Sequence, residues 1–199
     1  MPFYPGSTGQ VHYRSWPAGT TPAWCDLVIV HGRGQHSALY HHVARRLTGA
    51  GIAVHGLDLA GHGLSEGDTE RPDPSVSAGD LRLLAGTLGR PRAVLGHSLG
   101  AATVIADVAT GGTWEAAILC GTPAKAVGPE ALDRLTALPT LFVHGADDRM
   151  TPLDPLLDAI GDRAVAVEVF PDAGHDLFHE PIERRVTARV LDFLRATVG

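Results

Sequence analysis

A serine between glycines is the strongest chemical signal in the sequence. Ser98 lies in the run GHSLG (96–100), directly after the apolar run 93–96 and before a stretch typical of a helix. A sharp strand-to-helix turn of this kind exposes a serine hydroxyl and leaves room only for small residues two positions before and after it. The start of the following helix favours negative charge nearby. The run therefore predicts a nucleophilic serine, while a glycine-rich turn capped by a serine is the simpler alternative.

Candidate partners for this serine follow two later apolar runs. Asp147 and Asp148 come after the run 140–145, and His175 comes after the run 164–170. An imidazole can take the proton of a serine hydroxyl, and a carboxylate can hold that imidazole in the required tautomer. The chain order serine, acid, histidine is a known order for a catalytic triad. The residues alone leave both aspartates open, and each could instead be an ordinary turn residue.

A glycine-rich loop follows the first strongly apolar run, at residues 31–34 (HGRG). In the triad arrangement above, an amide from such a loop and the amide after the nucleophile form the oxyanion hole. We therefore expect the backbone N–H groups of Arg33 and Leu99 to bind the oxyanion, with the Arg33 side chain free to sense a substrate anion. This constellation predicts ester hydrolysis through an acyl-enzyme, with no metal and no organic cofactor.

The elements that would position these residues alternate along the chain. Short apolar runs read as strands, and longer amphipathic stretches between them read as helices. This alternation predicts one α/β domain over residues 1–199, with a mostly parallel sheet and its ligand site at the carboxyl ends of the strands. The expected strands are 27–30, 52–57, 93–96, 116–120, 140–145 and 164–170, and the expected helices are 40–50, 76–88, 99–110, 155–160 and 181–198.

Five motifs together resemble the monoacylglycerol lipase/lysophospholipase-like branch of the α/β-hydrolases. They are HGRGQHSALY (31–40), GLDLAGHGLSEG (56–67), GHSLG (96–100), HGADDRMTP (144–152) and GHDLFHE (174–180). The resemblance covers roughly residues 11 to 195 and implies the α/β-hydrolase fold.

The resemblance assigns roles to particular residues. It implies Ser98 as nucleophile, His175 as base, and the amides of Arg33 and Leu99 as the oxyanion hole. Because the family's acid stands three residues after a glycine, Gly145 indicates Asp148 and not Asp147.

Three other positions of the resemblance are expected to matter less for the chemistry. The resemblance gives structural roles to Asp58 and to the loop 61–63. The usual glutamate of the family is replaced here by Gln35, from which we expect little consequence.

One departure from the family pattern bears on the substrate. Such lipases insert a cap of several dozen residues between two late strands, but here the interval is only residues 121–139. It has room for a loop and one short helix at 129–138. We therefore expect an uncapped, open and shallow site, acting on a small or acyl ester of the lysophospholipid or monoacylglycerol kind.

Bulk composition excludes several other functions. A net charge of −6 argues against a nucleic-acid partner, which needs a clustered basic face. The two cysteines, Cys25 and Cys120, lie beside or within apolar runs and are expected to be buried thiols. We find no signal-peptide pattern and no apolar run long enough to span a bilayer, so the cytoplasm is the expected compartment.

Two alternatives to an esterase stay open. The same triad cleaves thioesters, so a thioesterase acting on acyl-CoA or carrier-bound acyl chains is one. A non-catalytic binding protein on a hydrolase scaffold is the other, because a fold does not fix a function. The oligomeric state cannot be deduced from the sequence.

Overall fold

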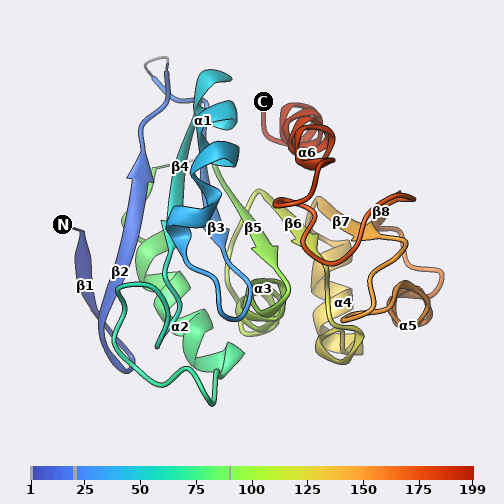
Figure 1. The fold of residues 1–199 in the computed structure, drawn as a ribbon, viewed down its shortest axis with the longest axis horizontal. Helices are drawn as coiled ribbons and strands as arrows, with labels where there is room; N and C mark the ends of the chain where they lie inside the picture. The colour runs from blue at the N-terminus through green and yellow to red at the C-terminus, as the bar shows by residue number, and fades with distance from the viewer. Residues whose placement is uncertain (1, 20–21, 90) are drawn as a thin grey trace.

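A sheet of eight strands crosses the computed structural model, which describes residues 2–19, 22–89 and 91–199. The strand order is β1-β2-β4-β3-β5-β6-β7-β8, with β1 at one edge and β8 at the other (Figure 1). Strands β3 to β8 are parallel, and β2 is antiparallel to both of its neighbours. The strands are β1 (Phe3–Gly6), β2 (Gly9–Trp16), β3 (Cys25–Val30), β4 (Ile52–Leu57), β5 (Arg92–His97), β6 (Ala116–Cys120), β7 (Thr140–Gly145) and β8 (Ala166–Phe170).

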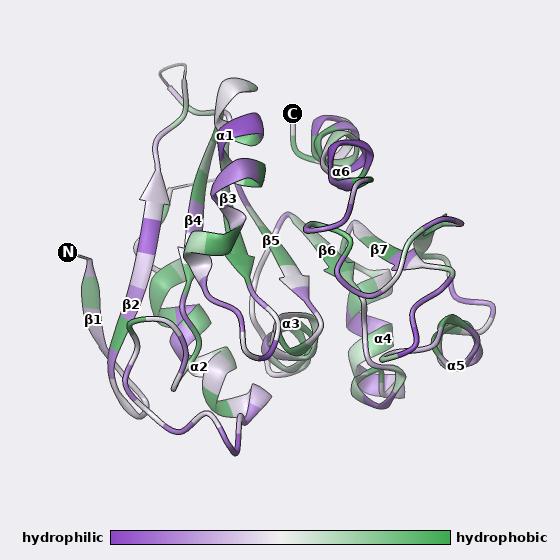
Figure 2. Cartoon of the chain, viewed as in Figure 1, coloured by the Kyte–Doolittle hydropathy of each residue, from purple (hydrophilic) through white to green (hydrophobic). Residues whose placement is uncertain are grey.

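The central strands are apolar on both faces because helices cover both faces of the sheet. In β3, Leu27 and Ile29 belong to one hydrophobic cluster, whereas Val28 and Val30 belong to the cluster on the opposite face. Side chains alternate across a strand, so a continuous apolar run fills two cores at once. Figure 2 shows the apolar colour concentrated in the central strands and in stripes along the helices.

Two helices pack on one face of the sheet and four on the other. Helices α1 and α6 contribute to the first cluster, and α2, α3, α4 and α5 to the second. A short 3-10 turn, η1 (Ser37–Tyr40), leads into α1. The helices are α1 (His41–Gly49), α2 (Pro74–Ala85), α3 (Leu99–Ala109), α4 (Pro129–Thr136), α5 (Leu153–Ile160) and α6 (Glu183–Thr197).

The expected fold class and most expected elements are confirmed. Strands 52–57, 116–120 and 140–145 have the predicted bounds, while the strand predicted at 164–170 is shorter and begins at Ala166. The two N-terminal strands were not predicted. Most of their side chains are exposed or half-buried, so neither forms an apolar run.

The segment between β6 and β7 forms no extra domain above the sheet. It contains only the 3-10 turn η2 (Ala124–Ala126) and helix α4, which packs against α3 through its buried residues Leu132 and Leu135. No separate cap is built from residues 121–139, so the carboxyl edge of the sheet is open at this point. Among the described residues, no helix is both long and apolar enough to cross a lipid bilayer.

Candidate active site

Ser98 lies at a sharp turn between β5 and α3. Its backbone has φ 53° and ψ −109°, and it is the one non-glycine residue of the described chain with a positive φ. A side chain at Gly96 would meet the backbone of Gly100 at 2.5 Å, and one at Gly100 would collide with the carbonyl of Val30. Only glycine fits at both positions. The tight packing therefore holds Ser98 in a strained conformation that projects its hydroxyl above the sheet.

The structure brings Ser98, His175 and Asp148 together although they lie far apart in the chain. His175 Nε2 is 2.9 Å from Ser98 Oγ, and His175 Nδ1 is 2.7 Å from Asp148 Oδ2. Because an ionised carboxylate can only accept, Nδ1 carries the proton and Nε2 presents a lone pair to the serine hydroxyl. This is the tautomer that a general base needs.

Asp148 is enclosed by donors from its own loop. Its Oδ1 accepts the amides of Met150 (2.9 Å) and Thr151 (2.8 Å), and its Oδ2 accepts the Thr151 hydroxyl (2.7 Å). Burial raises the pKa of this carboxyl, but the hydrogen bonds from Thr151 and His175 outweigh it, and the pKa falls below its usual value. Asp148 is therefore an anion facing the imidazole throughout the neutral range.

Asp147, the other candidate acid, points elsewhere. Its residue is exposed, its amide donates to the carbonyl of Ala173, and its carboxylate has no hydrogen-bond partner within the described parts of the chain. The geometry thus favours Asp148 over Asp147 as the partner of His175, a choice that the residue types alone left open.

The histidine loop is held by a second carboxylate. Glu180 accepts the amide of Gly174 at 2.9 Å and the amide of Asp176 at 3.1 Å, so it closes the loop on both sides of His175. Underneath, a side chain at Gly121, at the end of β6, would lie 3.2 Å from His175 Cε1. The backbone on both sides of His175 is therefore fixed, and its imidazole packs closely against Gly121.

The expected oxyanion amides lie on adjoining segments. The start of α3 packs directly on the end of β3, because Gly100 meets the carbonyls of Val30 and His31. The loop that carries Arg33 therefore begins beside the helix that carries Leu99. Neither amide is used in a hydrogen bond within the described residues, and the first amides of a helix have no intrahelical partner. Two free donors thus lie near the nucleophile.

The loop after β4 supports this edge of the sheet and takes no part in the triad. Asp58 accepts the amides of Ser37 (2.7 Å) and Leu64 (3.0 Å) and is almost fully buried. A side chain at Gly63 would collide with the Asp58 carboxylate. Asp58 and the loop 61–63 therefore have the structural role expected for them.

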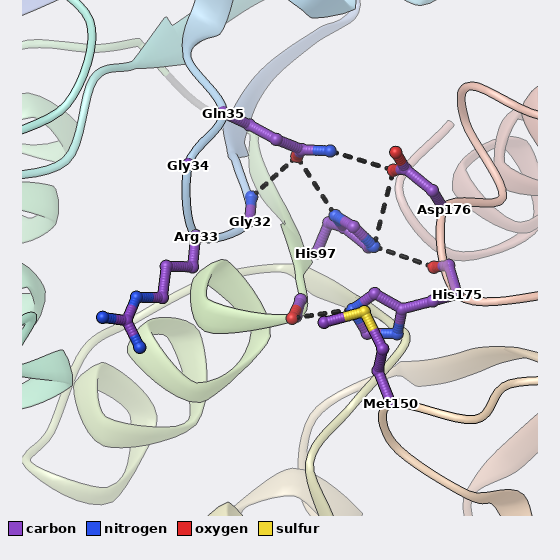
Figure 3. A pocket seen from close by; sticks show the side chains of 9 residues that line it. Gly32, Arg33, Gly34, Gln35, His97, Met150, His175 and Asp176 are labelled. Carbon is purple, nitrogen blue, oxygen red and sulfur yellow. Dashed lines mark hydrogen bonds and ion pairs between the residues drawn. The ribbon is translucent and has the colours of Figure 1, made fainter.

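A cleft of about 270 Å³ opens over Ser98 (Figure 3). Its walls are residues 32–35, His97, Met150, His175 and Asp176. Figure 3 shows the Arg33 guanidinium directed away from His97 and His175, and this group donates to the carbonyl of Glu70 at 3.3 Å. In the described part of the chain no group of three or more His, Cys, Asp or Glu side chains is arranged to hold a metal ion.

Sequence reasoning missed several side chains of this site. Thr151 contacts both Asp148 and His175, while Gln35, His97 and Asp176 form a hydrogen-bonded group behind the base. All lie within the motifs of the resemblance. Nothing in their spacing shows that Gln35 touches a residue 141 positions away.

The strand order and the turn at Ser98 are those of an α/β-hydrolase. The esterase EaEST from Exiguobacterium antarcticum has the same fold, with a TM-score of 0.80 at 16% identity over 97% of this chain and 98% of that one. Residues 25–135, more than half of the chain, match the family described as serine aminopeptidase, S33. The chain belongs to this family.

Curated relatives place the chain among the carboxylic ester hydrolases of this fold. Monoacylglycerol lipase of Mycolicibacterium smegmatis is 27% identical over 261 positions, covering 93% of this chain and 92% of the relative. Monoglyceride lipase of Homo sapiens is 32% identical over 139 positions, covering 66% of this chain and 45% of the relative. The first alignment is longer than the 199 residues of this chain, so that relative contains insertions absent here.

Proposed function

We propose that this chain hydrolyses small carboxylic esters through an acyl-enzyme on Ser98, with His175 as base and Asp148 as the acid that orients it. The observation that carries the proposal is the continuous hydrogen-bonded row from Asp148 Oδ2 through both nitrogens of His175 to Ser98 Oγ, with distances of 2.7 and 2.9 Å. A serine hydroxyl is a weak nucleophile until an adjacent base removes its proton.

Acylation follows from this geometry. His175 Nε2 takes the proton of Ser98 as Oγ bonds to the ester carbonyl carbon, and the carbonyl oxygen becomes an oxyanion held by the amides of Arg33 and Leu99. The imidazolium is stabilised by Asp148. When the ester C–O bond breaks, the same proton passes from Nε2 to the departing alkoxide, which leaves as an alcohol.

Deacylation repeats the sequence with water. His175 Nε2 takes a proton from a water molecule as its oxygen bonds to the acyl carbon. The second oxyanion collapses, the bond to Ser98 Oγ breaks, and the proton returns to Oγ. The products are a carboxylic acid and the free enzyme.

Two hollows beside the triad support a small or acyl ester as the substrate. The cleft over Ser98 and a second hollow of about 360 Å³ share Met150 as a wall, and the second is lined largely by Pro123, Ala124, Pro152 and Pro155. These apolar surfaces suit short acyl chains or the near part of a longer one. The relatives named as monoacylglycerol and monoglyceride lipases support a monoacylglycerol ester as the natural type of substrate.

Labelling by a fluorophosphonate probe tests the proposal. We expect rapid labelling of the wild type, none of Ser98→Ala, and strongly slowed labelling of His175→Ala. Ser75→Ala is the matched control, because Ser75 is exposed and lies outside the cleft. Labelling of Ser98→Ala at the wild-type rate would refute the assignment.

A comparison of leaving groups separates the esterase from the thioesterase alternative. Acetyl and hexanoyl esters of p-nitrophenol are compared with the corresponding acyl-CoA thioesters. We expect kcat/KM to favour the esters, since Arg33 and Lys125 are the only cationic side chains among the residues that line the two hollows, too few to bind a polyanionic carrier. A preference for acyl-CoA would change the proposed substrate from an ester to a thioester, while the proposed roles of the triad residues would stay the same.

A further inference from the structure

One side chain behind the site joins the oxyanion loop to the histidine loop. Gln35 Oε1 accepts the amide of Gly32 at 2.9 Å and the hydroxyl of Tyr40 at 2.8 Å. Its Nε2 donates to Asp176 Oδ1 at 2.9 Å (Figure 3). Gly32 directly precedes the expected oxyanion donor Arg33, and Asp176 directly follows the base. The side-chain amide of Gln35 therefore connects the loop of the expected oxyanion donor to the loop of the base.

The orientation of this amide is imposed by its partners. A backbone N–H can only donate, so the oxygen of Gln35 must face Gly32. An ionised carboxylate can only accept, so the nitrogen of Gln35 must face Asp176. The hydrogen bond from His179, 2.9 Å from the same Oδ1, is the main reason that the pKa of Asp176 falls to about 2. Position 35 therefore faces a fixed negative charge.

His97, the residue before the nucleophile, completes the group. Its Nε2 is 2.9 Å from the carbonyl of His175, and its Nδ1 is 3.2 Å from Gln35 Oε1. Burial lowers the pKa of His97 to about 4, so at neutral pH the ring has one proton for two oxygens. Because Oε1 already accepts two hydrogen bonds, we place that proton on Nε2. His97 thus holds the backbone of the base and packs against Gln35.

We propose that Gln35 is a positioning residue that couples the oxyanion loop to the base, and that its side chain has to be a neutral amide because it faces Asp176. The inference rests on the proposed function and adds a requirement to it. It also gives Gln35 a definite role where the resemblance to the family suggested little consequence of the exchange.

The exchange Gln35→Glu keeps the shape of the side chain, removes the donor and adds a negative charge. Two carboxylate oxygens would then face each other at the distance of a hydrogen bond, in surroundings made by Tyr40, His97 and the Asp176–His179 pair, with His175 behind His97. Like charges at this distance favour a shared proton. When the pair is fully ionised at high pH, repulsion pushes the two loops apart.

Kinetics of p-nitrophenyl acetate hydrolysis between pH 5 and pH 9 test the proposal. For Gln35→Glu we expect kcat at least tenfold below the wild type at pH 9, with KM little changed. The deficit should shrink as the pH falls and the pair gains its proton. A side chain that only supported the fold would lower activity without this added pH dependence.

The reversed pair provides the control for charge. In Gln35→Glu/Asp176→Asn the carboxylate and the amide exchange places, so the hydrogen bond forms again with the donor on the other side. We expect kcat within about threefold of the wild type and a parallel pH profile. Asp176→Asn alone should be mild, since the asparagine oxygen can accept from Gln35. Asp172→Asn, an exposed change of the same charge on the same loop, should have no effect.

The outcomes separate this inference from the triad assignment. If Ser98→Ala keeps activity, the proposed function fails. If Ser98→Ala is inactive but Gln35→Glu stays within twofold of the wild type at every pH, or the double variant is as slow as Gln35→Glu, the coupling is wrong. Should Gln35→Glu not fold, Gln35→Met removes the hydrogen bonds to Gly32, Tyr40 and Asp176 at similar volume. A tenfold loss of kcat supports the proposal, and wild-type kcat overturns it.

Discussion

The hydroxyl of Thr151 donates a 2.7 Å hydrogen bond to Oδ2 of Asp148, the same oxygen that faces His175. Thr151 Oγ1 is also 3.2 Å from His175 Nδ1. The hydroxyl therefore lies beside the Asp148–His175 hydrogen bond and fixes the orientation of the carboxylate plane. Its amide contributes a further hydrogen bond to Oδ1. Thr151 therefore orients the Asp148 carboxylate through both its hydroxyl and its amide.

Replacing the Thr151 hydroxyl should slow catalysis without abolishing it. Thr151→Val keeps the shape and the amide but loses one hydrogen bond, whose net contribution is about 1 kcal/mol. We expect kcat for p-nitrophenyl acetate to fall about threefold to tenfold. Thr151→Ser, which keeps the hydroxyl, should remain close to the wild type. Equal rates for the valine and serine variants would show that the hydroxyl has no such role.

The two neighbouring aspartates should differ sharply in effect. In Asp148→Asn the side-chain oxygen is needed by the amides of Met150 and Thr151, so the amide nitrogen faces His175 Nδ1 and favours the wrong tautomer. We expect kcat to fall by about 10²- to 10⁴-fold. Asp147→Asn changes an exposed side chain and should stay within twofold. Steady-state kinetics of the two variants provide the test, and the opposite ranking would move the acid to Asp147.

Stability should fall between neutral pH and pH 5 because of buried neutral histidines. Burial lowers the pKa of His31 and His97 from the usual histidine value to about 4, and lowers that of His144 as well. As the pH falls through this window, the unfolded chain binds protons that the folded protein does not. Each such histidine adds a slope approaching about 1.4 kcal/mol per pH unit.

One histidine acts in the opposite direction. The hydrogen bond to Asp176 raises the pKa of His179, so its contribution to stability is present at low pH and is lost as the pH rises through its folded-state value. The three histidines with a lowered pKa have a larger combined effect on stability than the one histidine with a raised pKa. Urea unfolding at pH 7 and pH 5 should therefore give the lower free energy of unfolding at pH 5, and His31→Asn should reduce the difference. Equal stability at the two values would contradict this assignment of neutral rings.

Acyl-chain length should matter only over a short range. Each methylene buried against apolar surface contributes about 0.8 kcal/mol, but a chain that extends past the two hollows meets water. For p-nitrophenyl esters we expect kcat/KM to rise from acetate to about hexanoate and then level off. A series from acetate to palmitate below the micelle limit measures this. A steady rise to palmitate would require a tunnel that the interval 121–139 does not build.

Much of the fold follows from the sequence because most strands are buried on both faces. A run such as 116–120 fills two cores and stands out as apolar. The β1–β2 hairpin does not, because it lies at the edge of the sheet and most of its residues are exposed or half-buried. Edge strand β8 was still predicted, since its two valines and the buried Phe170 leave an apolar pattern although Val169 is exposed.

The site divides in the same way between chemistry that the sequence displays and contacts that it does not. Ser98, Asp148 and His175 follow the carboxyl ends of strands, where a parallel sheet gathers them. Choosing Asp148 over Asp147 needed either the family spacing or the coordinates. The contacts of Gln35, Thr151 and Asp176 could not be predicted, because they depend on how side chains from separate loops are oriented toward one another. Their residue types alone are those of ordinary polar loop positions.

The most direct test of the account is to find the atom that carries the acyl group. Wild-type protein is quenched in acid during turnover of p-nitrophenyl acetate, and its peptides are mapped by mass spectrometry. We predict acetyl on Ser98 in the wild type and on no residue in Ser98→Ala, which should also have lost turnover. Acetyl on another residue of the wild type, or undiminished turnover by Ser98→Ala, would contradict the proposed mechanism.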